Sequence, residues 1–193
     1  MKSHINDVFR QIQLKTRYRT IGKIYSHLTA EEKLTLVSLA RSCEGSFIEI
    51  GSYLGSSSCF IAEGILQSGR KSHLYCIDTW QNDAMSEGNK NTYNTFLNNT
   101  KDYRDVISPL RGWSYDIAKN FDEKVDFIFI DGDHSYQGVK KDVDLWLPKL
   151  NPGALIVMHD IGWAEGVQRV VMEDIAPIAK CEGRLPNLYW ARI

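Results

Sequence analysis

Short runs of consecutive apolar residues alternate along the chain with segments whose apolar residues recur every three or four positions. The runs cover residues 46–50, 73–78, 125–131 and 154–160, with a weaker one at 106–110 and a closing candidate at 188–193. Continuous apolar character over a short run is typical of parallel strands that are buried on both faces. The pattern therefore predicts a buried, largely parallel sheet.

Helical spacing is found before, between and after these runs. Two helices are expected before the first strand, one over residues 5–12 and one up to about Arg41. Thr29 followed by Glu32 predicts that a capping box opens the second of these helices. Further helices are predicted after the first, fourth and fifth strands, at residues 61–66, 136–147 and 167–175.

Alternation of strands and helices indicates the fold class. Parallel neighbours need long crossover connections, and helices supply them, so we expect an α/β sheet covered on both faces. One segment, residues 80–100, breaks the alternation, because only Tyr93, Phe96 and Leu97 have helical spacing there. It is interpreted either as a solvated surface loop or as a substrate lid.

Composition narrows the class of partner. The chain has 193 residues, 23 Lys and Arg against 24 Asp and Glu, and a sequence pI near 6.5. This balance argues against nucleic acid or an anionic membrane as partner and favours a small molecule. Neither a signal peptide nor a membrane span is recognisable, and the four cysteines are widely spaced, so we expect reduced thiols and a cytoplasmic protein.

Acidic residues stand at or near the ends of four predicted strands. These residues are Glu49, Asp78, Asp131 and Asp160. The carboxyl ends of parallel strands share one edge of the sheet, which is where ligands bind in such folds. Close carboxylates repel one another, so ribose hydroxyls, a cationic ligand, a divalent metal or backbone N–H groups are expected to offset the charge. Capping of the following helices is the simpler structural explanation for any single acid.

A glycine turn, from Gly51 to Gly55, follows the first predicted strand and opens a helix. Glycines at such a turn allow the backbone to approach a ligand closely. The turn lacks the central glycine of the dinucleotide fingerprint, because Tyr53 stands in its place. Asp78, at the end of the second strand, is well placed to accept hydrogen bonds from both hydroxyls of a ribose.

These residues resemble a known family. Residues 49–57, EIGSYLGSS, are similar to motif I of class I S-adenosylmethionine-dependent methyltransferases in the ExGxYxGxS form of catechol-type enzymes. Residues 125–160, with the run DGDHSY, resemble small-molecule methyltransferases related to the macrocin type. The resemblance implies a Rossmann-like fold with a seven-stranded, mostly parallel sheet, an antiparallel last strand and helices on both faces.

The resemblance also implies a single methyltransferase domain over residues 1–193. Residues 46–193 would be its cofactor-binding core, and the N-terminal helices within residues 1–45 would form a lid on the acceptor side. The residues expected to bind S-adenosylmethionine are Glu49, Gly51, Ser52, Tyr53, Gly55, Ser57, Asp78, Thr79, Trp80, Gly112, Trp113, Ser114 and Asp131. Among these, Thr79 and Trp80 would flank the adenine, and Trp113 would either stack on it or pack beneath its loop.

Five residues bear on the reaction. By resemblance, Asp131, His159 and Asp160 would hold a divalent metal such as magnesium. An imidazole at position 159 departs from the family pattern and favours a softer ion or no metal. His134 would serve as general base towards the acceptor, or would only cap the helix that begins near Tyr136. Asp131 and Asp133 are the other catalytic candidates, Asp133 as a base or as a cap of that same helix.

The sequence therefore predicts an S-adenosylmethionine-dependent O-methyltransferase for a small hydroxylated acceptor, a sugar or an aromatic compound, with metal assistance left open. Two other functions compete with it. One is an NAD-dependent oxidoreductase on a doubly wound fold, which the absent central glycine disfavours, and the other is a non-catalytic cofactor-binding protein. The oligomeric state is left open between a monomer and a homodimer.

Overall fold

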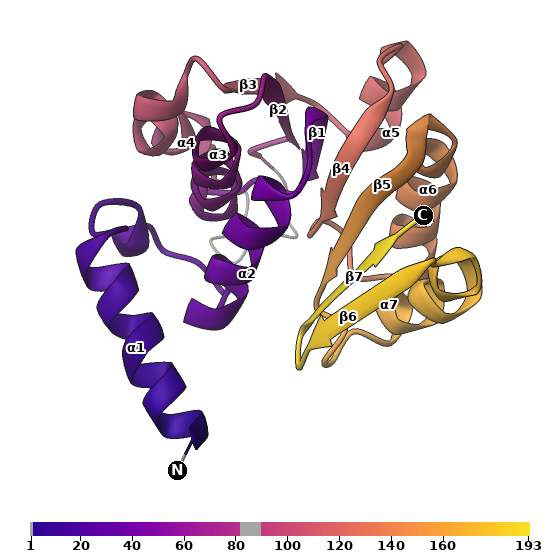
Figure 1. Cartoon of the computed structure of the whole chain (residues 1–193). Helices are drawn as coiled ribbons and strands as arrows, with labels where there is room; N and C mark the ends of the chain where they lie inside the picture. Colours follow the sequence, from indigo (N-terminus) through magenta and orange to yellow (C-terminus); the bar gives the residue numbers. More distant parts are fainter. Residues whose placement is uncertain (1, 82–89) are drawn as a thin grey trace.

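A single mixed sheet organises the chain. The computed structural model describes residues 2–81 and 90–193, and in these residues seven strands pair in the order β3-β2-β1-β4-β5-β7-β6 (Figure 1). The strands are β1 (Gly45–Ile50), β2 (Ser72–Asp78), β3 (Ile107–Arg111), β4 (Val125–Ile130), β5 (Leu150–His159), β6 (Cys181–Leu185) and β7 (Leu188–Arg192).

Strand pairing confirms the predicted fold class. The first five strands pair in parallel, while β7 is antiparallel to both β5 and β6. The chain reverses direction across the sheet between β1 and β4, so the crevice beside β1 is the topological switch point where ligands bind in such folds. The apolar pattern predicted every strand except β6, and only the resemblance implied a seventh.

Helices cover both faces, as expected. The helices are α1 (Lys2–Thr16), α2 (Ala30–Arg41), α3 (Ser56–Ser68), α4 (Tyr93–Thr100), α5 (Ser114–Ile117), α6 (Tyr136–Trp146) and α7 (Glu165–Val170). Figure 1 shows α2, α3 and α4 on one side of the sheet and α5, α6 and α7 on the other. Each face has its own apolar core, with Phe47 and Phe127 in the first and Ile48 and Ile128 in the second, because successive residues of a strand point to opposite faces.

The second helix begins as its sequence predicts. The Thr29 side chain accepts a hydrogen bond from the backbone N–H of Glu32, and the Thr29 N–H donates to the Glu32 carboxylate. This reciprocal pair satisfies two donors that a helix start would otherwise leave without partners. The helix places Glu32 in a buried position beneath the carboxyl edge of the sheet.

The segment that broke the sequence pattern contributes a helix, α4. Phe96 of this helix is fully buried and packs against Trp80 and the turn at Gly55. The predicted spacing at Tyr93 and Phe96 is therefore confirmed as helical. Residues 82–89, on which part of the loop or lid interpretation rests, lie outside the described residues.

The N-terminal helix α1 extends away from the sheet (Figure 1). Its apolar residues Val8, Phe9 and Ile12 are all exposed. Among the described helices, none combines the length and apolar character that crossing a bilayer requires. Each of the four cysteines is free, and only Cys181 is exposed.

Candidate functional site

Backbone strain marks the carboxyl edge of the sheet. Among the described residues, three residues other than glycine have a positive φ: Tyr53 at 44°, Trp80 at 50° and Asp160 at 61°. They follow β1, β2 and β5, respectively, so all three lie at the same edge. Strain of this kind costs free energy and concentrates at ligand-binding and catalytic sites, which makes this edge the candidate site.

The glycine turn after β1 lies against the loop that follows β4. Gly51 has a φ of 87°, and a Cβ at this position would approach the carbonyl oxygen of Asp131 to 2.0 Å. The Asp131 N–H in turn donates to the Ile50 carbonyl at 2.9 Å. Only glycine allows this approach, so the turn and the Asp131 loop form one continuous backbone surface.

The carboxylate of Asp78 supports the same turn. Its Oδ2 accepts from the Tyr53 N–H at 2.8 Å, and its Oδ1 accepts from the Trp80 N–H at 2.6 Å. Burial raises the pKa of Asp78, although the backbone hydrogen bonds oppose that change. Because a carboxylate oxygen accepts more than one hydrogen bond, the group retains capacity for ligand hydroxyls.

The contacts of Thr79 and Trp80, which follow Asp78, could not be predicted from the sequence. The Trp80 side chain is 0% exposed, packs against Tyr93 and Phe96, and donates its indole N–H to the Tyr53 carbonyl at 2.8 Å. The indole ring is therefore part of the apolar core, and a role of Trp80 beside the adenine stays a prediction. Thr79 accepts a hydrogen bond on its carbonyl from Arg111 at 3.1 Å.

Glu49, near the end of β1, is a buried acid that lies just before the turn. This carboxylate is fully buried, accepts a hydrogen bond from Ser58, and has its pKa raised by burial. Four buried side-chain oxygens here have no hydrogen-bond partner among the described residues: Glu49 Oε1, Ser52 Oγ, Tyr53 Oη and Ser56 Oγ. Buried polar atoms are normally satisfied, so these oxygens are candidates for hydrogen bonds with a polar ligand.

The segment after β3 presents an exposed aromatic surface. Trp113 is half exposed and stacks on Tyr115 with the ring centroids 5.7 Å apart. Ser114 is buried and donates a hydrogen bond to the carboxylate of Asp142 on α6. The Gly112 N–H donates to the Asp78 carbonyl at 2.9 Å, which ties this segment to the end of β2.

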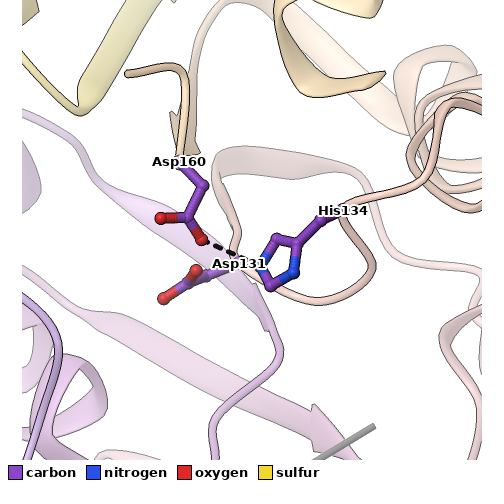
Figure 2. Close-up of side chains that lie close together, drawn as sticks. All are labelled: Asp131, His134 and Asp160. Atoms are coloured by element: carbon purple, nitrogen blue, oxygen red, sulfur yellow. Dashed lines mark ion pairs between the residues drawn. The ribbon is translucent and has the colours of Figure 1, made fainter. Parts of the chain in front are cut away.

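Two acids and two imidazoles meet beyond β4 and β5, in a cluster formed by Asp131, His134, His159 and Asp160. Figure 2 shows His134 and Asp160 directed towards each other beside Asp131. The His134 Nε2 lies 2.8 Å from Asp160 Oδ2, and the His159 Nδ1 lies 3.1 Å from Asp131 Oδ1 and 3.2 Å from Asp160 Oδ1. The predicted acids thus separate into three places: Glu49 under the turn, Asp78 beside it, and Asp131 with Asp160 in this cluster.

His159 forms the buried centre of the cluster. It is 3% exposed, and its Nε2 lies 3.7 Å from a carboxylate oxygen of Glu32. Burial disfavours the charged imidazole, but the carboxylates of Asp131 and Asp160 at hydrogen-bond distance, together with the nearby Glu32, outweigh burial and raise the pKa of His159 to about 12. The surrounding carboxylates therefore favour the charged form of the His159 imidazole.

His134 forms the exposed rim of the cluster. Its side chain is 44% exposed, and the hydrogen bond with Asp160 raises its pKa. The interpretation of His134 as a helix cap is wrong, because Ser135 caps α6 by accepting from the Gly138 N–H at 3.1 Å. When Nε2 carries the proton donated to Asp160, Nδ1 of the neutral ring has a free lone pair and can accept a proton.

The neighbouring acids have different environments. Asp133 is exposed and accepts from the Ser135 N–H at 2.7 Å, which shapes the turn before α6. For Asp160, burial is outweighed by hydrogen bonds from His134 and His159, so its pKa falls well below the usual range. Burial raises the pKa of Asp131.

The donor set for a metal differs from the one inferred by resemblance. Among the described residues, the ligand atoms of Asp131, His134 and Asp160 lie within 4.8 Å of one another. His159 stands behind this group, with its Nδ1 between the two carboxylates. Two carboxylates with one imidazole fit a divalent transition metal better than magnesium, which prefers oxygen ligands.

Three residues that the sequence reasoning did not assign to the site belong to it. Asn187 donates to Asp160 Oδ1 at 2.9 Å, and its Nδ2 also lies 3.3 Å from His159 Nε2. Trp163 donates its indole N–H to Asp160 Oδ1 at 2.7 Å, and Glu32 reaches His159 from α2. No local signal identifies such partners, because Glu32 and His159 are brought together only by the fold.

A cavity of about 500 Å³ lies elsewhere, between α3, α4 and the turn after α1. It is lined by residues such as Arg17, Arg19, Glu63 and Asn98, and none of the predicted site residues lines it. The chemistry of the candidate site is therefore separate from this cavity.

Two curated proteins are similar to this chain in sequence. An uncharacterized protein, R132, of Acanthamoeba polyphaga mimivirus is 28% identical over 142 residues, which is 69% of this chain and 60% of that protein. Another, y4gI of Sinorhizobium fredii, is 26% identical over 115 residues, 58% of this chain but 13% of that protein. The chain thus spans less than two thirds of these curated relatives.

A solved structure shows the same fold. The O-methyltransferase TomG of Streptomyces achromogenes, in complex with SAM, aligns with a TM-score of 0.64 at 16% identity, covering 97% of this chain and 89% of that one. The family described as methyltransferase domain matches residues 48–161, which contain the glycine turn, Asp78, Asp131 and Asp160. The chain belongs to this methyltransferase family.

Proposed function

We propose that this protein transfers a methyl group from S-adenosylmethionine to a hydroxyl of a small acceptor. The proposal rests on two groups that lie at the same edge of the sheet. The first is the glycine turn after β1 with Asp78, and the second is the His134–Asp160 pair beyond β4. The first group suits a nucleoside, and the second suits removal of a hydroxyl proton. A similar fold binds SAM in TomG.

The residues around the turn fit the cofactor. Gly51 leaves the backbone open to close approach, and Asp78 retains acceptor capacity for ribose hydroxyls. The unpartnered oxygens of Ser52 and Glu49 offer hydrogen-bonding positions for the polar end of the methionine moiety. The half-exposed Trp113 would supply an indole face for the adenine.

For methyl transfer, the main task of the protein is to position the methyl donor and the acceptor hydroxyl. S-adenosylmethionine supplies a methyl group on a positively charged sulfur, which an oxygen displaces in line. The acidic residues along the edge tolerate that positive charge. The backbone surface shared by the turn and the Asp131 loop holds donor and acceptor sides at a fixed separation.

His134 is the proposed base. Its Nε2 donates to Asp160, so its Nδ1 faces the acceptor hydroxyl as proton acceptor. Asp160 fixes the ring orientation and favours the imidazolium that forms. Asp133, engaged in the turn before α6, is the weaker candidate.

A divalent cation would be held by Asp131, His134 and Asp160. When bound, it would orient the acceptor oxygens and lower the pKa of the attacking hydroxyl. In that arrangement His134 would be a ligand rather than a base. Transfer measured with and without a chelator separates the two arrangements: transfer that survives the chelator supports His134 as base, and transfer that is lost supports the metal.

The N-terminal helices are proposed to cover the acceptor side. Glu32 of α2 contacts His159 within the cluster, and Tyr25, just before α2, lies with its ring centroid 6.5 Å from that of Tyr53. This N-terminal region therefore approaches both groups of the site through Tyr25 and Glu32, and we assign the floor of the site to the α/β core that follows.

The cofactor assignment is tested by calorimetry. Asp78→Ala is expected to lower the affinity for S-adenosylmethionine at least tenfold, because it removes the ribose acceptor and the support of the turn. Asp105→Ala, which changes an exposed acid before β3, is the control and should bind as the unmodified protein does. Equal affinities of the two variants would contradict the assignment.

A further inference from the structure

We infer that Trp163 is the acceptor-recognition residue of this site and that the acceptor is a flat aromatic compound with one or two hydroxyl groups. The inference rests on the proposed function. The inference adds to the proposed function the residue that the acceptor ring contacts and the choice of an aromatic compound over a sugar.

Trp163 lies at the mouth of the acid–imidazole cluster. Its side chain is 60% exposed, and its ring centroid is 4.9 Å from that of His134, the proposed base. Single exposed apolar residues are ordinary on protein surfaces. This one differs because it stands beside the atom that would receive the acceptor's proton.

The indole is also held in place. Its N–H donates to the buried carboxylate of Asp160 at 2.7 Å, and Asp160 itself is fixed by its hydrogen bond from Asn187. A side chain anchored at one end loses little conformational freedom on binding a ligand. The remaining indole surface therefore forms a rigid platform on which a ring can stack.

The polar atoms nearby decide the class of acceptor. Asp160 Oδ1 accepts from Trp163 and Asn187, and its Oδ2 bonds with His134. The Asn187 amide is engaged too, because its Oδ1 accepts from the Gly162 N–H at 2.9 Å. Among the described contacts of this cluster, Asp131 Oδ2 and His134 Nδ1 have no partner.

Two free polar atoms beside an aromatic platform suit a flat ring with one or two hydroxyls. A sugar would bring several hydroxyls, each of which needs a partner when it is desolvated, and the cluster has few left to offer. The structure therefore favours an aromatic acceptor.

The test uses 2-naphthol, a fluorescent hydroxylated aromatic compound, titrated against protein saturated with S-adenosylhomocysteine. We expect saturable binding that weakens about five-fold in Trp163→Leu, which keeps apolar bulk without the aromatic ring. Trp163→Phe, which restores a ring, should bind within two-fold of the unmodified protein. Met172→Ala, which changes an exposed residue after α7, is the control and should bind normally.

Three outcomes would overturn the inference. They are no saturable binding of 2-naphthol, the same 2-naphthol affinity in Trp163→Leu as in the unmodified protein, or a methyl glucoside affinity, measured by competition, that equals the affinity for 2-naphthol. Calorimetry with S-adenosylhomocysteine alone separates these outcomes from failure of the proposed function. If the nucleoside binds and 2-naphthol does not, the acceptor inference fails on its own. If neither binds, the proposed function fails first.

Discussion

At the scale of single residues, Gly51 decides whether the turn and the Asp131 loop can share one surface. Gly51 and Gly153 both have a φ of 87°, but a Cβ at Gly51 would meet the Asp131 carbonyl at 2.0 Å, whereas nothing lies within 4 Å at Gly153. Gly153→Ala should therefore cost only the backbone strain, about 1 kcal/mol. Gly51→Ala should cost clearly more and should abolish cofactor binding.

Urea denaturation of both variants measures this difference, since the strain is common to both and the collision is not. The free energy of unfolding should fall further in Gly51→Ala than in Gly153→Ala. If both variants lost the same stability and both bound S-adenosylmethionine, the close approach at Gly51 would matter neither for stability nor for cofactor binding.

Also at this scale, Asp142 makes stability depend on pH. Burial raises its pKa to about 6, while the hydrogen bond from Ser114 opposes this, and Asp133 and Lys141 are the charged neighbours. A folded-state pKa above the unfolded value means that the native protein binds more protons, so stability is present at low pH and is lost as the pH rises from about 4 through 6. Asp142→Asn should therefore stabilise the protein at pH 7.5 by on the order of 2 to 3 kcal/mol.

Unfolding free energies at pH 4 and pH 7.5 check this prediction. The gain from Asp142→Asn should be small at the lower pH and large at the higher one. Asp144→Asn, two residues along α6, changes a half-exposed carboxylate paired with Lys140 and should alter stability by less than about 1 kcal/mol at either pH. A gain from Asp142→Asn that did not grow with pH would mean that burial does not raise the pKa of Asp142.

At the scale of elements, the capping box fixes where α2 starts and so where Glu32 meets His159. Thr29→Ala removes the side-chain oxygen that accepts from the Glu32 N–H and should cost about 1 kcal/mol of unfolding free energy. Thr29→Ser retains that oxygen and should cost only a few tenths of a kcal/mol. Thermal or urea unfolding distinguishes them, and equal losses would show that the methyl group rather than the cap matters.

Sequence pattern predicted these elements where burial is two-sided and failed where it is not. The central strands are continuous apolar runs because both faces are covered, whereas β6, with the sequence CEGRL at the edge of the sheet, is largely exposed and carries no such signal. The helix at Tyr136 was predictable from its spacing. Its N-cap, Ser135, is identified by the hydrogen bond that its hydroxyl oxygen accepts from the Gly138 N–H.

The candidate site, too, was predictable in some features and not in others. Acids at strand ends could be predicted because strand direction alone brings them to one edge. Their grouping could not be predicted, because it depends on side-chain directions and on contacts distant in sequence, such as Asn187 with Asp160. Trp80 illustrates the same limit: its position after a strand indicates a residue near the ligand, but the sequence does not show that its ring packs in the core.

At the scale of the whole molecule, the proposed ligand should stabilise the entire fold, because its site joins loops from both sides of the crevice beside β1. Ligand at one hundred times its dissociation constant adds about 2.7 kcal/mol to the unfolding free energy. For a chain of this size that corresponds to a rise in melting temperature of roughly 5 to 10 °C. S-adenosylhomocysteine should produce this rise, and NAD at the same concentration should not, because Tyr53 replaces the glycine that a pyrophosphate needs. Asp78→Ala should lose the rise. A shift with NAD alone would instead identify an oxidoreductase on this fold.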